Sequence, residues 1–171
     1  MEDSTYSIKK IKLLRLVIIL SLVYSFGLAV VDYFHITPKI EYRVEVMSFY
    51  AFCNTLLLLW ILRSTTQFNK NILYAVLVLA LVVFSITMVI YPFSEIRVMW
   101  YFFTIMIAYY VGGRIVGHTT AIASLIIIYY LHFAYDLDFS ATANASIIIG
   151  ILFVSQLSNY FVTILDENEK E

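Results

Sequence analysis

Nine ionisable side chains lie at or beside the ends of apolar segments in this 171-residue chain. They comprise six acids, two histidines and one arginine: Asp32, His35, Glu41, Glu45, Glu95, Arg97, His132, Asp136 and Asp138. Ionisable residues in or near membrane-spanning segments are costly to place and often functional. We expect a pocket for a cation, a proton or a polar ligand, in which Arg97 pairs with a carboxylate. The alternative is that these residues only mark where helices leave the hydrocarbon and meet water.

The predicted ligand contacts are a subset of this group together with two aromatic residues. They are Asp32, His35, Glu45, Arg97, Trp100, Tyr101, His132 and Asp136. Trp100 begins an aromatic run that ends at Phe103, and such a run could line a pocket for a flat hydrophobic ligand such as a quinone. An aromatic belt at a membrane boundary is the other explanation for this run.

Two histidines of one predicted helix suggest a further kind of site. His118 and His132 are 14 residues apart, which places them about 40° from eclipsed and about 21 Å apart along a helix. This spacing is similar to that by which one helix of a cytochrome b bundle serves two haems. Because His35 is predicted at the same outer level as His132, a haem b held by these two histidines is one alternative. Interfacial or core histidines are the other, and no further metal site is expected.

The composition determines which class of protein can carry these residues. Hydrophobic residues make up 62% of the chain, charged residues 13%, and the mean hydropathy is +0.88, whereas soluble domains carry about 25% charged residues. An all-α integral membrane protein is therefore expected, and soluble enzymes are excluded. The net charge of −1 leaves no basic surface for nucleic acid. Because the motifs HExxH, GxSxG and the P-loop are absent, we do not expect an enzyme.

Apolar runs bounded by charge or turn residues predict a bundle of six transmembrane helices. The predicted spans cover residues 13–35, 44–63, 71–91, 96–116, 118–135 and 143–165. Residues 1–12 would form a cytoplasmic N-terminal segment, residues 13–165 the transmembrane domain, and residues 166–171 the start of a cytoplasmic linker or tail. The span 71–91 is mainly aliphatic, so we expect it to face lipid.

The other spans carry polar stripes at helical spacing, which we expect to face one another. The stripes include Ser21 and Ser25; Glu45, Ser48, Phe52 and Thr55; and Tyr101, Thr104 and Ala108. The segment from Gly112 to Gly117 is expected to be a tight cytoplasmic turn, in which glycine lets the chain reverse direction.

The distribution of lysine and arginine predicts the orientation of the bundle. With the N-terminus in the cytoplasm, eight basic residues lie inside and three outside, which satisfies the positive-inside rule. The outside residues are Lys39, Arg43 and Arg97. Six crossings then return the C-terminus to the cytoplasm, and we expect a multi-pass protein of the bacterial inner membrane.

Two segments carry a resemblance to a known class of sensor. The residues from Tyr91 to Phe103, followed by Gly112 to Gly117, are similar to the N-terminal membrane-associated sensor (MASE-type) regions of bacterial diguanylate cyclases and sensor histidine kinases. Ser158 to Phe161, leading into Asp166, resembles the place where such proteins run their last helix into a cytoplasmic signalling helix. The resemblance implies a receptor domain, usually a homodimer, that senses a ligand and transmits a helix shift. The chain itself carries no GGDEF motif and no kinase His box.

We therefore expect a transmembrane sensory input domain that detects a periplasmic or membrane ligand and passes a helix shift to a cytoplasmic output domain. Its partners would be membrane lipid, a second copy of the chain and a small ligand, but no nucleic acid. A small transporter or transporter substrate-binding subunit is the alternative, although such proteins use broken helices and mid-membrane charges. A haem- or quinone-binding membrane protein is the further alternative.

Overall fold

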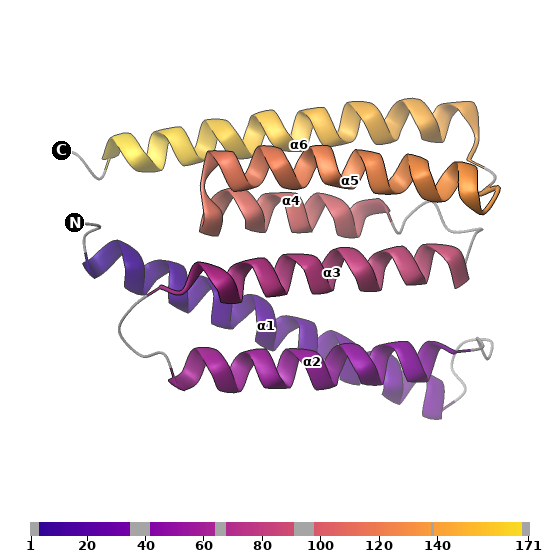
Figure 1. Cartoon of the computed structure of the whole chain (residues 1–171), viewed down its shortest axis with the longest axis horizontal. Coiled ribbons are helices and arrows are strands. Elements are labelled where there is room, and N and C mark those ends of the chain that lie inside the picture. The colour runs from indigo at the N-terminus through magenta and orange to yellow at the C-terminus, as the bar shows by residue number, and fades with distance from the viewer. Residues whose placement is uncertain (1–3, 35–41, 64–67, 91–97, 138, 169–171) are drawn as a thin grey trace. The chain divides into compact units, whose positions relative to one another are not determined.

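The computed structural model of the chain describes residues 4–34, 42–63, 68–90, 98–137 and 139–168. Within these ranges every regular element is a helix, which confirms the prediction of an all-α protein (Figure 1). The helices are α1 (Ser4–Tyr33), α2 (Arg43–Arg63), α3 (Lys70–Ile90), α4 (Val98–Gly112), α5 (Arg114–Ala134) and α6 (Ala141–Asn168).

Five of these helices, all except α4, are long and apolar enough to cross a membrane. A span needs about 20 residues to cross about 30 Å of hydrocarbon. The helix α4 has 15 residues, which corresponds to about 22 Å at 1.5 Å per residue. The fourth predicted span, residues 96–116, thus corresponds to a shorter helix between Val98 and Gly112. The count of six spans and the cytoplasmic placement of both termini stay predictions.

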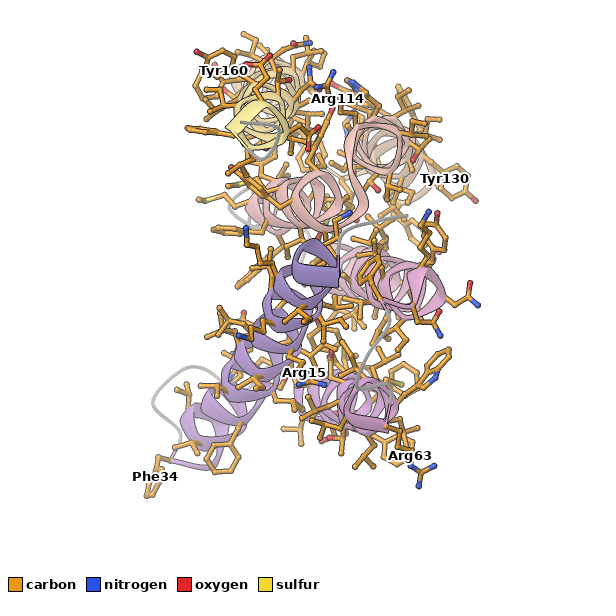
Figure 2. The ribbon with its side chains drawn as sticks, turned by 90° about the vertical axis from the view of Figure 1, so that its left-hand side faces the viewer. Arg15, Phe34, Arg63, Arg114, Tyr130 and Tyr160 are labelled. Carbon is orange, nitrogen blue, oxygen red and sulfur yellow. The ribbon has the colours of Figure 1, made fainter. Side chains whose placement is uncertain are left out.

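The chain divides into two compact units, Met1–Leu79 and Ala80–Glu171, so that α3 contributes to both. In the first unit α1 and α2 pack as an antiparallel pair. The guanidinium of Arg15 donates to the carbonyl oxygen of Ile61 at 3.2 Å (Figure 2). The last four carbonyls of a helix lack partners within it, and a cation there is favourable. Arg15 therefore stabilises the C-terminal end of α2.

The polar stripe of α1 faces α2, as predicted. The hydroxyl of Tyr50 donates to Ser21 Oγ at 3.4 Å, and Ser25 is buried. Hydroxyls on this stripe also donate to the carbonyl one turn earlier, as Ser25 does to Ser21. A serine can therefore lie at this contact without leaving its hydroxyl unsatisfied.

Within the first unit, the predicted stripe of α2 does not pack on α1. Its four members, Glu45, Ser48, Phe52 and Thr55, are exposed on the chain, whereas Met47, Tyr50, Asn54 and Ile61 are buried. Both faces repeat at three or four residues, so periodicity alone could not separate them. Thr55 needs no neighbouring helix, because its hydroxyl donates to the carbonyl of Ala51 at 2.8 Å.

In the second unit α4, α5 and α6 pack on one another around a core centred on α4. The side chains of Tyr101, Ile105 and Tyr109 are completely buried, together with Ile128 of α5. The face of α4 predicted from Tyr101, Thr104 and Ala108 is confirmed, since all three residues are buried.

The helix α3 does not simply face lipid, contrary to the prediction for residues 71–91. Within the second unit its Ser85 Oγ lies 3.0 Å from the hydroxyl of Tyr101, and Phe84 stacks on Trp100 with 5.6 Å between ring centroids. Aliphatic side chains suit a protein core as well as they suit lipid tails. The aliphatic composition of α3 was therefore no guide to what it contacts.

Candidate functional site

The two compact units divide the eight predicted ligand contacts between them. Asp32, His35 and Glu45 belong to the first, whereas Arg97, Trp100, Tyr101, His132 and Asp136 belong to the second. His35 and Arg97 lie outside the described residues, and for Asp32, near the end of α1, only the backbone is described. The pairing of Arg97 with a carboxylate and the haem between His35 and His132 stay predictions.

Glu45 is exposed in the first turn of α2. A carboxylate at this place is stabilised by the positive end of the helix dipole. The helix terminus thus favours a carboxylate at this position, and the ligand role of Glu45 stays a prediction.

His132 is held by the connection that follows α5. Its Nδ1 lies 2.5 Å from the carbonyl oxygen of Leu137, and its ring stacks on Phe139 at 5.1 Å and 14°. Since a carbonyl can only accept, Nδ1 carries a proton and donates, which leaves Nε2 as the ring nitrogen that could contact a ligand. Asp136 follows in a turn with φ of 50° and an exposed side chain. The described residues contain no group of three or more His, Cys, Asp or Glu side chains that could hold a metal ion.

Trp100 and Tyr101 serve packing between α3 and α4. Trp100 stacks on Phe84, and the buried hydroxyl of Tyr101 pairs with Ser85. Of the same aromatic run only Phe102 lines a cavity of about 210 Å³, which lies between the N-terminal parts of α4 and α6. Its lining consists of Val98, Met99, Phe102, Ser140, Thr142, Ala143, Ser146 and Ile147. Apolar walls with a few hydroxyls suit a small amphipathic ligand.

Three polar side chains meet where α4 ends and α5 begins, a feature absent from the sequence predictions. The hydroxyl of Tyr109, on α4, lies 2.7 Å from His118 Nδ1 of α5 and 2.5 Å from Ser155 Oγ of α6. The Tyr109 side chain is completely buried, and its ring meets the imidazole edge to face at 5.2 Å. A phenol can donate one hydrogen bond and accept another. Tyr109 therefore connects three helices through one oxygen atom.

Glycine makes this approach of α4 and α5 feasible at two positions. Gly113 is the one residue between the helices and has φ of 82°, a left-handed conformation that favours glycine. A Cβ on Gly117 would lie 2.3 to 2.5 Å from three ring carbons of Tyr109. The predicted turn from Gly112 to Gly117 is thus shorter than expected, and Gly117 lies inside α5.

An ion pair and an unpaired amide lie further along α6. Arg114 approaches Asp166 with 3.7 Å between nitrogen and oxygen, and both side chains are partly exposed (Figure 2). The buried Oδ1 of Asn159, one turn beyond Ser155, has no hydrogen-bond partner among the described residues. Contacts of α6 with Tyr109 and with Arg114 thus lie at Ser155 and at Asp166, both in its C-terminal half.

The sequence held a partial signal for this network. Tyr109 precedes Gly113 by four residues and His118 follows it by five, so a helix reversal at Gly113 brings the two side chains to the same level. Ser155 offered no comparable signal, because its partner lies 46 residues away. Comparison with protein families, with curated proteins and with solved structures finds no match for this chain.

Proposed function

We propose that the chain is the transmembrane sensory input domain of a bacterial signalling receptor. It would detect a small periplasmic or membrane ligand and pass a helix shift to a cytoplasmic output domain. Five helices long and apolar enough to cross a membrane support the location. The excess of basic residues on one side of the predicted spans supports six crossings of the inner membrane, with both termini in the cytoplasm.

The observation that carries the proposal is the coupling of α6 to the two helices before it. α6 is one uninterrupted helix of 28 residues, about 42 Å long at 1.5 Å per residue, and so exceeds the hydrocarbon thickness. Tyr109, whose hydroxyl also pairs with His118 of α5, meets Ser155 of α6, and Arg114 meets its Asp166. A change in the packing of α4 against α5 would therefore move the C-terminal half of α6.

The cavity between α4 and α6 is the proposed place of ligand entry. Met99 and Phe102 of α4 face Ile147 of α6 across it, and Thr142 and Ser146 supply hydroxyls. An amphipathic molecule held there would set the separation of the two helices near the start of α6. The polar network would then carry this change toward the C-terminal half of the same helix.

The proposal is tested by fusing the full chain through α6 to an output domain whose activity is measured in membranes. Tyr109→Phe removes the hydroxyl that joins three helices and should alter basal output or its response to ligands. Tyr110→Phe removes a hydroxyl from the neighbouring residue and should leave output unchanged. Equal output in wild type and both variants, at equal expression, would remove the support for signal transfer through α6.

Two further measurements separate the sensory role from its alternatives. His132→Ala, or Arg97→Ala, should change the response without loss of expression if the predicted ligand contacts act in sensing. A Soret band in the purified protein would instead favour the haem alternative. Ligand accumulation in sealed vesicles that contain the purified chain would favour the transporter alternative.

A further inference from the structure

An exposed glutamine lies near the middle of α6. Gln156 follows Ser140, which caps the helix, by 16 residues and precedes Asp166 by ten residues. It therefore lies about 4.5 Å from the midpoint between these polar ends at 1.5 Å per residue. The hydrocarbon extends about 15 Å to either side of the bilayer centre. In a membrane-spanning α6 the Gln156 amide is thus surrounded by hydrocarbon.

The amide of Gln156 makes no hydrogen bond among the described residues, and its side chain is exposed. Two nearby polar residues of the same helix have partners within the chain, whereas the buried Oδ1 of Asn159 has none among the described residues. Thr163 donates to the carbonyl of Asn159 at 2.8 Å, and Ser155 pairs with Tyr109. An unpaired amide in hydrocarbon is costly, because lipid tails offer neither donors nor acceptors. Gln156 therefore calls for a polar partner at the same depth.

The surface around Gln156 is suited to another helix. Ile149, Leu152, Phe153 and Tyr160 flank it at intervals of three, four and seven residues. All four side chains are more than half exposed, and Tyr160 points away from the unit in Figure 2. We call the stripe formed by these four residues and Gln156 the Gln156 face. A polar side chain within an apolar stripe is a recognised way to set the register of paired helices.

We infer that the Gln156 face pairs with the same face of a second copy of the chain. A primary amide both donates and accepts, so two glutamines related by a two-fold axis can form reciprocal hydrogen bonds. Successive residues of a helix point about 100° apart, so pairing at Gln156 leaves Ser155 in contact with Tyr109. The partner of the proposed sensory domain would thus be a second copy of the same chain. The pairing rests on the membrane-spanning placement of α6 and does not need the sensory activity.

Self-association of the full chain in lipid vesicles tests the pairing. Donor- and acceptor-labelled chains are mixed at a series of protein-to-lipid ratios, and energy transfer gives the dimer dissociation constant. Gln156→Leu keeps a similar size but removes the amide, and it should weaken the dimer about 3- to 30-fold, the range expected for hydrogen bonds between membrane helices. Gln156→Asn retains an amide and should weaken it less. An unchanged dissociation constant in Gln156→Leu, or a monomeric wild type, would overturn the inference.

Cysteine cross-linking identifies the face that is used. With the single Cys53 replaced by alanine, Leu152→Cys places a thiol on the Gln156 face while the amide remains. Phe161→Cys places one about 180° away around the helix. Oxidation should link Leu152→Cys chains into dimers and leave Phe161→Cys chains monomeric. The reverse pattern would show that the chains pair through another face. Failure of both variants to cross-link while energy transfer persists would also show another interface. Either result would refute the pairing through the Gln156 face. Loss of signalling with intact pairing would count only against the proposed sensory function.

Discussion

Gly117→Ala gives the sharpest test of the contact between α4 and α5. The added methyl group would lie 2.3, 2.4 and 2.5 Å from Cγ, Cδ1 and Cδ2 of Tyr109. Carbon atoms normally approach to about 3.5 to 4.0 Å, so the ring or the helix must move by about 1 Å. The ring cannot move freely, because Tyr109 is completely buried and its hydroxyl is bonded to His118 and Ser155.

The expected effect is a balance of three contributions to the free energy of unfolding. Overpacking in a close-packed site costs about 1 to 3 kcal/mol. Displacement of the Tyr109 hydroxyl from one or both partners costs about 1 kcal/mol for each hydrogen bond. Alanine in place of glycine inside a helix returns about 1 kcal/mol. Gly117→Ala should therefore destabilise the protein by about 1 to 4 kcal/mol.

Two other helical glycines, Gly27 and Gly150, provide a matched series. A Cβ on Gly27 would meet no atom within 4 Å, so Gly27→Ala should leave stability unchanged or raise it by up to about 1 kcal/mol. A Cβ on Gly150 would lie 2.6 Å from Cζ at the tip of the Phe102 ring. Because a ring tip can turn aside more easily than its base, Gly150→Ala should fall between the other two.

Unfolding of the three variants in mixed detergent micelles, followed by circular dichroism, measures this order. Folded spectra of equal helical content would ensure that the compared states are the same. The reasoning would be refuted if Gly117→Ala were as stable as Gly27→Ala. It would also be refuted if Tyr109→Ala, which removes the obstructing ring, did not reduce the cost of Gly117→Ala in the double variant.

Further predictions follow from single contacts of the second unit. Gly113→Ala places a Cβ at φ of 82° and ψ of −176°, a region that is populated almost only by glycine, and should lower stability by about 1 to 3 kcal/mol, measured by the same unfolding assay. Ser85→Ala leaves the buried hydroxyl of Tyr101 without its partner at 3.0 Å and should cost about 1 to 3 kcal/mol, whereas an unchanged stability would indicate that water replaces Ser85. Asp166→Asn removes the ion pair with Arg114. The side chain of Asp166 is 38% exposed and that of Arg114 is 49% exposed, so the free energy of unfolding should fall by less than about 1 kcal/mol. That loss should vanish at high salt, and a large effect that salt does not change would contradict the partial exposure.

Apolar patterning gave most of the helix positions without any tertiary information. The boundaries predicted for residues 44–63 and 71–91 differ from those of α2 and α3 by one residue at most. Spans of this kind are bounded by charges such as Arg43, Arg63 and Lys70, which are costly to bury in hydrocarbon. The end of α4 was less well predicted. Only Gly113 separates α4 from α5, and no charged residue precedes it at the end of α4.

The candidate site was much harder to predict. That His132 and Tyr101 contact a ligand stays a prediction, and the sequence held no sign that His132 bonds to the carbonyl of Leu137 or that Tyr101 pairs with Ser85. Residue type signals the capacity to bind, whereas the neighbours that use this capacity come from distant parts of the chain. The Tyr109 and Ser155 pair, 46 residues apart, escaped the sequence for the same reason.

The sequence by itself determined that this protein is helical and suited to a membrane, because hydrophobicity and its run lengths are properties of consecutive residues. Only the tertiary structure decided which face of each helix is buried. Lipid and protein core are equally apolar, so the stripe of α2 through Phe52 and the buried face through Tyr50 have the same periodicity. Tertiary structure also decided that Tyr109 bridges three helices and that Gln156 is exposed. Both outcomes depend on how the helices are rotated against one another, which packing sets and local sequence does not.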